Sequence, residues 1–197
     1  MARGRPRSFD RDAALERAME IFWAKGFEAT QLAELMSAMG INPPSFYAAF
    51  GSKEALYREA LDLYLSTVGA VSMKVLAETQ DVRAAIKGML LASLNVALAS
   101  PSSGGCMVSL GLFNCQEQNA PLRDHMRELR RSTERLIRQR LERGIADGEL
   151  TTETDTARLA TYFSTIIQGI SLQAQDGATR ETLLGLVKTA MAALPNG

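Results

Sequence analysis

Apolar residues recur along this chain mainly three and four positions apart, the spacing that gathers them on one face of an α-helix. Ala14, Ala18 and Phe22, for example, form one such stripe near the N-terminus. No stretch alternates apolar and polar residues for long enough to predict a strand. The pattern predicts an all-α protein with about nine helices, at residues 10–25, 31–39, 43–50, 53–77, 82–99, 106–116, 122–146, 155–175 and 180–194.

Capping residues mark where several of these helices begin and end. Thr30, Asn42 and Ser52 each stand where a side-chain oxygen can accept a hydrogen bond from the first turn of a helix. Pro43 follows Asn42 at a first helical position, where its missing N–H costs nothing. Gly40 separates two short helices, and two such helices joined by a tight glycine-containing turn form a helix-turn-helix.

The second of these short helices has distinct inner and outer sides. Phe46 and Phe50 are expected to face the core, which leaves Ser45, Tyr47 and Ala48 free to enter a DNA major groove. The same spacing also occurs in helical hairpins of other folds, so periodicity alone leaves both interpretations open.

Charge is balanced over the whole chain, with 22 basic and 22 acidic residues, but it is not evenly distributed. Arg3, Arg5 and Arg7 all precede the first acidic residue, Asp10. Arginines that alternate with glycine and proline suit an extended segment lying in a narrow A·T minor groove. A disordered tail that adds only non-specific attraction is the alternative.

Composition narrows the class of protein further. Hydrophobic residues make up 46% of the 197, and no apolar stretch approaches the roughly 18 residues that span a membrane. The N-terminus has no apolar signal core, and the two cysteines do not have metal-ligand spacing. We therefore expect a cytoplasmic protein with no cofactor or metal. No acid–base pair suggests an enzyme.

Residues 27–56 resemble the N-terminal domain of the TetR family of repressors. The shared features are Gly26-Phe27, Thr30, Gly40-Ile41, Tyr47 with Phe50, and Lys53-Glu54-Ala55-Leu56. The resemblance covers about residues 8–60, and the remainder matches the family only in the number and length of its helices. It implies a basic arm at 1–7, a helix-turn-helix DNA-binding domain at 8–60, and an effector-binding and dimerisation domain at 61–197.

The resemblance also implies which side chains contact DNA. Tyr47 and Lys53 stand where the family grips phosphates, and Thr30 with the helix start after it is suited to bind another. Asn42 and Ser45 are better placed for base edges, whereas Tyr47 could instead be a core aromatic. Pro44 departs from the family pattern and puts a base contact at its own position in doubt. The expected DNA-binding residues are Arg3, Arg5, Arg7, Thr30, Asn42, Pro43, Ser45, Tyr47 and Lys53.

Two apolar seams near the C-terminus suit a four-helix bundle across a two-fold axis, the family's dimer arrangement. Gly169 and Gly185 lie within these helices, where glycine costs about 1 kcal/mol relative to alanine unless close helix approach needs it. Packing of both seams inside one subunit is the alternative. The expected interface residues are Leu159, Phe163, Ile166, Gly169, Ile170, Leu183, Val187 and Leu194.

An inducer pocket in the C-terminal part is expected by resemblance. Apolar side chains would form its walls, although most of them would look the same in a core that holds no ligand. Asn95, Asn114 and Gln116 are candidate polar anchors. The expected effector-binding residues are Met73, Met89, Leu90, Leu94, Cys106, Met107, Leu110 and Phe113.

Cys106 follows two glycines at the expected start of a helix, a position that can favour a reactive thiolate. It is therefore a candidate target for an electrophilic inducer. A small buried packing residue is the alternative. Cys115 lies nine positions later, about 13 Å along a continuous helix, too far for a disulfide between the two.

Eight arginines lie between Arg123 and Arg143, and we expect them on a solvated face or against an acidic partner. The function predicted overall is repression by a homodimer on a pseudo-palindromic DNA operator, with release by a small-molecule inducer, which could be a reactive electrophile. The alternative is an all-helical carrier or enzyme that has the same fold but binds no operator.

Overall fold

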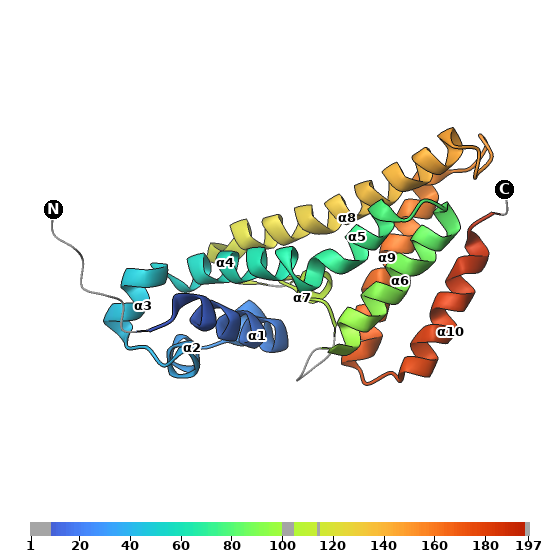
Figure 1. Cartoon of the computed structure of the whole chain (residues 1–197). Coiled ribbons are helices and arrows are strands. Elements are labelled where there is room, and N and C mark those ends of the chain that lie inside the picture. Colours follow the sequence, from blue (N-terminus) through green and yellow to red (C-terminus); the bar gives the residue numbers. More distant parts are fainter. Residues whose placement is uncertain (1–8, 100–104, 114, 196–197) are drawn as a thin grey trace.

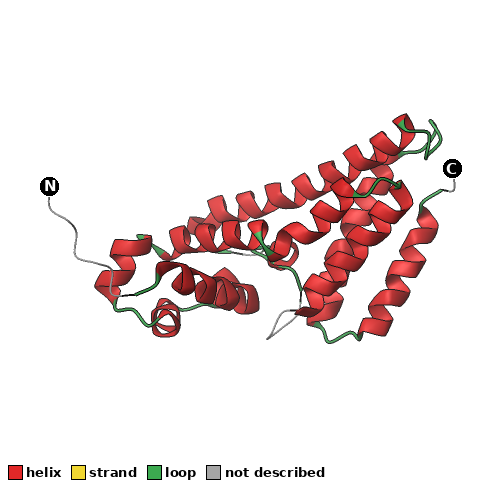
Figure 2. Cartoon of the chain, viewed as in Figure 1, coloured by secondary structure: helices red, strands yellow, loops and turns green. Residues whose placement is uncertain are grey.

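The computed structural model describes residues 9–99, 105–113 and 115–195, which contain ten α-helices and no strand (Figure 2). This confirms the predicted all-α class. The helices are α1 (Arg11–Ala29), α2 (Leu32–Met39), α3 (Pro43–Phe50), α4 (Lys53–Ser66), α5 (Val71–Glu78), α6 (Val82–Ala99), α7 (Met107–Leu110), α8 (Ala120–Ala146), α9 (Thr156–Gln175) and α10 (Arg180–Ala190). Short 3₁₀ turns lie at Val68–Ala70, Glu117–Asn119 and Met191–Ala193.

Helices α1 to α4 form one end of the molecule, which we call the head (residues 11–66) (Figure 1). Aromatic rings hold it together: the ring of Tyr57 on α4 packs edge-on against Phe22 at 5.0 Å and against Phe27 at 5.2 Å. Phe46 and Phe50 of α3 are buried in the same core. The buried side of α3 is therefore the one that its sequence predicts.

Helices α5 to α10 form the other end, which we call the body (residues 71–190), and α8 runs along both parts (Figure 1). The central helix is α6, which packs against α5, α8, α9 and α10. It is long and apolar enough to cross a membrane, although no such stretch is expected from the sequence. Since 56% of α6 is buried inside the protein, these apolar residues build the core.

The single helix predicted over residues 53–77 is wrong. The backbone turns at Thr67, with φ −119° and ψ −101°, and the segments on either side are bent by 49°. The hydroxyls of Ser66 and Thr67 both donate to the carbonyl of Leu63, which competes with helical hydrogen bonding. A Cβ on Gly69 would lie 2.6 Å from the Tyr64 ring, so only glycine lets the chain pass this side chain closely.

The helix predicted over residues 106–116 is also wrong, because Met107–Leu110 is the only helical part of its described residues. Leu112 has a positive φ of 49°, a conformation that breaks a right-handed helix. A Cβ on Gly111 would lie 2.5 Å from the Met107 carbonyl oxygen and 2.5 Å from Cε of Met126. This tight segment passes between α8 and the head.

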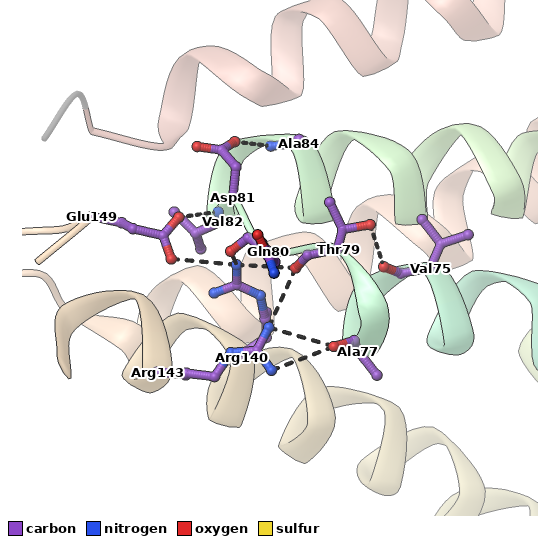
Figure 3. A network of polar contacts seen from close by, with 10 residues as sticks. All are labelled: Val75, Ala77, Thr79, Gln80, Asp81, Val82, Ala84, Arg140, Arg143 and Glu149. Atoms are coloured by element: carbon purple, nitrogen blue, oxygen red, sulfur yellow. Dashed lines mark hydrogen bonds and ion pairs between the residues drawn. The ribbon is translucent and has the colours of Figure 1, made fainter. Parts of the chain in front are cut away.

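The expectation that every arginine of α8 lies on a solvated face fails at Arg140, which is only 4% exposed. Its Nη2 donates to the carbonyl of Thr79 at 3.3 Å and to that of Gln80, and lies 3.5 Å from Glu149 Oε1 (Figure 3). The other carboxylate oxygen of Glu149 accepts from the Val82 N–H at the start of α6. These contacts join the α5–α6 turn, α8 and the α8–α9 turn, and we call them the Arg140 clamp.

Candidate DNA-binding face and ligand cavities

The start of α3 is built by its own first residues. The side-chain oxygen of Asn42 accepts a hydrogen bond from the backbone N–H of Ser45 at 3.0 Å, so Asn42 caps the helix as predicted. Pro43 and Pro44 occupy the first two helical positions. Asn42, Pro43 and Tyr47 are exposed, and Ser45 is half-buried. All four are therefore accessible in the first half of α3 and at its cap.

Tyr47 is not a core aromatic. Its side chain is 55% exposed, and its ring packs edge-on against Phe46 at 5.3 Å, which holds it at the surface. A phenol held in this way presents its hydroxyl outward, where it can donate to a phosphate oxygen.

Lys53 lies at the start of α4 and is half-buried. Its ammonium is 4.2 Å from the centre of the Phe27 ring, within range of a cation–π contact. Burial lowers the pKa of Lys53, while the nearby carboxylates of Glu28 and Glu54 raise it. The side chain is thus held against the head rather than free to move.

Thr30 does not cap α2, contrary to the prediction. The N-cap residue of α2 is Gln31, and its side chain makes no capping hydrogen bond. Thr30 is 2% exposed, and its hydroxyl donates to the carbonyl of Gly26 at 2.6 Å. Gly26 has φ +73°, which takes its carbonyl out of the helical ladder and leaves it in need of a donor. The Thr30 hydroxyl is used inside the protein.

The arm residues Arg3, Arg5 and Arg7 lie outside the described residues. Arg11, a functional residue not expected from the sequence, is the first described arginine. It pairs with Glu59 at 2.6 Å, donates to the Ala49 carbonyl at 3.3 Å and stacks over Phe50. Arg11 thereby ties α1 to the end of α3. Its partners lie 38 and 48 positions away, and no local pattern could have revealed them.

A cavity of about 160 Å³ lies inside the body and reaches α4. Apolar side chains that line it include Met73, Val96, Leu129, Leu136 and Ile167. Hydroxyl groups are as prominent as the apolar side chains, and they come from Ser72, Ser93, Ser109, Ser132, Thr133, Ser164 and Ser171. We call this space the body cavity.

A second cavity, of about 570 Å³, lies between the head and the body. Trp23 and Gly26 of the head line one side, and Leu172 of α9 lines the other. Cys106 lines both cavities. We call this second space the junction cavity.

The structure places the expected effector residues in three groups. Met73 and Cys106 line the body cavity, and Cys106, Met107, Leu110 and Phe113 line the junction cavity. Met89, Leu90 and Leu94 are fully buried in the core and line neither. They fail as cavity walls because α6 is covered by helices on most of its sides.

Two of the expected polar anchors, Asn95 and Gln116, make hydrogen bonds within the protein. Asn95 accepts a hydrogen bond from Arg180 at 2.7 Å. Gln116 donates its backbone N–H to Glu28, and Asn114 lies outside the described residues. Serines supply most of the hydroxyl groups of the body cavity, and Gln168 and Arg130 add further polar groups. The serines were not expected from the sequence, because a scattered serine gives no periodic signal.

Cys106 precedes a helix of only four residues, so the helix expected over residues 106–116, whose start was to activate the thiol, is not there. The Tyr64 hydroxyl instead donates to the Cys106 sulfur at 3.2 Å. Burial, together with the neighbouring thiol, raises the pKa of Tyr64 far above its ordinary value. Tyr64 therefore remains a protonated donor at neutral pH.

The described residues from Gly105 to Asn119, which are 105–113 and 115–119, also contact the head. The indole N–H of Trp23 donates to the Gly105 carbonyl at 2.9 Å. Glu28 accepts from the Gln116 N–H at 3.1 Å and from the Asn119 amide at 2.8 Å. One segment thus lines the body cavity and holds the end of α1.

The two predicted dimer seams pack largely inside the chain. Five of the expected interface residues are buried in the body core: Phe163, Ile170, Leu183, Val187 and Leu194. Leu159, Ile166 and Gly169 are half-buried. Leu172 and Leu184 are the large apolar residues of α9 and α10 that are exposed. Periodicity had identified the apolar side of each helix, and the protein's own core covers most of it.

Comparison with known proteins agrees with this architecture. The family described as "Bacterial regulatory proteins, tetR family" matches residues 14–60, and "Tetracyclin repressor-like, C-terminal domain" matches residues 82–181. The HTH-type transcriptional repressor ComR of Escherichia coli K12 is 33% identical over 195 residues, which cover 98% of this chain and 93% of ComR. BdcR, another HTH-type transcriptional repressor of that organism, is 31% identical over 91% of this chain and 86% of its own.

A solved structure of a similar protein points to the same family. A cysteine mutant of the TetR family transcriptional regulator CifR, in complex with 26-base-pair operator DNA, superposes with a TM-score of 0.93. It is 43% identical, over 97% of this chain and all of CifR. These matches identify a DNA-binding transcriptional repressor rather than an enzyme, and they show that the chain belongs to the TetR family.

Proposed function

We propose that this protein represses transcription in the cytoplasm as a homodimer on a pseudo-palindromic operator, and that a small molecule in the body cavity releases it. The exposed face of α3 carries the proposal, because Asn42, Ser45 and Tyr47 stand together on an accessible helix that opens with two prolines. In a dimer, two such helices would enter successive major grooves about 34–36 Å apart. A carrier or enzyme on this fold would not bind a specific DNA site, so operator titration separates the two functions.

Lys53→Ala is expected to weaken binding to operator and random DNA alike. Loss of one phosphate contact would reduce the slope of log K against log salt concentration by about 0.9. Fluorescence anisotropy at several salt concentrations measures the slope. Lys74→Ala is the control, because Lys74 lies on α5 in the body. An unchanged slope for Lys53→Ala would show that this ammonium does not contact phosphate.

The outer side of α9 and α10 is the proposed contact between the two copies. Leu172 and Leu184 are exposed there, beside the half-buried Ile166. A Cβ added to Gly169 or Gly185 would meet nothing within 4 Å among the described residues, so none of their contacts requires glycine at either position. Close approach of a second copy would give both glycines a structural role.

Release is proposed to pass through the segment from Gly105 to Asn119. A ligand in the body cavity would contact Cys106, Val108 and Ser109. The same segment binds Trp23 and Glu28 of α1, so its displacement would turn the head. A ligand that prefers the displaced arrangement shifts the population toward it and lowers operator affinity.

Cys106 gives this release a second proposed route, by an electrophile. Its sulfur lies between the two cavities and next to the Tyr64 hydroxyl, so an added group would crowd Met107 and the end of α4. We expect an α,β-unsaturated aldehyde to release operator from wild type at a lower dose than from Cys106→Ser. Cys115→Ser is the control and should respond like wild type. Equal doses for wild type and Cys106→Ser would leave reversible binding as the only route.

A further inference from the structure

One positively charged side chain lines the body cavity and forms no ion pair within the described residues. Arg130 of α8 lines it and is the only side chain charged at neutral pH among the described residues that do so. No carboxylate in the described part of the chain forms an ion pair with it. Burial lowers the pKa of Arg130, and the nearby charge of Arg127 lowers it further. A half-buried cation in this setting gains from a bound anion.

Two hydrogen bonds and one ring contact tie the guanidinium to the chain around α7, and they leave other donors of the group unused. Its Nη1 donates to the carbonyls of Val108 and Gly111, both at 3.0 Å. The group also lies 4.5 Å from the centre of the Phe113 ring. These hydrogen bonds use only Nη1, and within the described residues no hydrogen bond engages Nε or Nη2, so both can donate to a ligand. A guanidinium presents its donors in a planar fork that matches the two oxygens of a carboxylate.

The other walls suit a small, mostly apolar molecule. Ser93 of α6 has a buried hydroxyl with no hydrogen-bond partner in the described residues. That hydroxyl can bind a second polar group of a ligand. Met73, Val96, Leu136 and Ile167 supply apolar surface. The volume of about 160 Å³ is close to that of a cavity that accepts benzene, roughly 150 Å³.

We propose that the body cavity binds a small monocarboxylate about the size of one aromatic ring, with its carboxylate on Arg130. The proposal rests on the function above and names the chemical class of the inducer. It also gives the ligand a direct connection to the head. Arg130 holds the carbonyls of Val108 and Gly111, which belong to the segment that binds α1. A carboxylate that draws Arg130 toward the cavity would move that segment.

The test compares acids with their neutral amides on the full-length protein. The probes are benzoate, phenylacetate and hexanoate, each paired with benzamide, phenylacetamide or hexanamide. Calorimetry measures binding, and anisotropy measures operator release at the same concentrations. At least one acid should bind tenfold or more tighter than its amide, roughly the value of a hydrogen bond to a charged group. If no acid exceeds its amide, the proposal is wrong.

Three variants test whether Arg130 is the residue that binds the carboxylate. Arg130→Gln should remove the preference for acid over amide, and Arg130→Lys should retain part of it. Arg131→Gln, an exposed neighbour on α8, is the control for loss of one positive charge and should bind the acids like wild type. Because Arg130 also holds two carbonyls, circular dichroism first checks that each variant folds. If Arg130→Gln does not fold, the test rests on two results. These are the acid preference that remains in Arg130→Lys and the difference between acids and amides in wild type.

The outcomes separate the two proposals. Release of operator by the amides as readily as by the acids would retain the body cavity as the inducer site and reject the carboxylate. Tight binding of an acid without operator release would retain the carboxylate site and reject its role in induction. An acid preference that survives in Arg130→Gln would overturn the assignment of Arg130.

Discussion

Ile170→Arg is expected to unfold the body of this protein. Ile170 has no exposed surface, and it lies on α9, which packs against α6, α8 and α10. An unpaired charge at such a site costs several kcal/mol, a large part of the roughly 5–15 kcal/mol that stabilises a domain. Circular dichroism and gel filtration should show lost helicity or aggregation. Operator binding should be lost with the fold.

Leu172→Arg is the matched control, two positions further along α9. Leu172 is 49% exposed, so an arginine there can reach solvent and the helix should fold. If the outer side of α9 joins two copies, this variant should sediment as a folded monomer with weakened operator binding. A folded, dimeric Ile170→Arg would show that the core of the body is not packed as described.

Arg140→Ala is expected to lower the free energy of unfolding by about 3 kcal/mol, as for other broken buried ion pairs. The change leaves the Thr79 and Gln80 carbonyls without their charged donor and Glu149 without its partner. It also opens space between α8 and the α5–α6 turn. Urea denaturation followed by circular dichroism measures the loss.

The control for the Arg140 clamp lies on the same helix. Arg138 pairs with Glu142 at 2.7 Å, but both side chains are exposed. Arg138→Ala should therefore change stability by no more than about 0.5 kcal/mol. Equal losses for the two variants would mean that Arg140 acts as an ordinary surface arginine.

Much of the fold follows from the sequence because helices leave local signals. The stripe of apolar residues in α1 and the Asn42 cap of α3 depend on neighbours three and four positions away. The helix-turn-helix and the family could be recognised for the same reason, since Gly40, Tyr47 and Lys53 belong to one short stretch. The exposure of Tyr47 also followed, because its neighbours Phe46 and Phe50 occupy the inner side.

What could not be predicted depends on contacts distant in sequence or on unusual backbone geometry. The break after α4 depends on how Gly69 passes the Tyr64 ring, and the end of α7 depends on Leu112. Arg140 is buried by the α5–α6 turn, about 60 positions away. Periodicity shows that one side of a helix is apolar but not what covers it, as Met89 and Ile170 illustrate.

The bend between α4 and α5 has a mechanical consequence. Helix α4 has 14 residues and is therefore about 21 Å long, and α3 is attached at its far end. A rotation of about 10° at Thr67 would carry that end through about 4 Å, a distance comparable to one base-pair step along DNA. The bend lies beside the body cavity, which Leu65 and Gly69 line. If the proposed release turns the head about this bend, the length of α4 would enlarge a small angular change into a displacement of that size at α3.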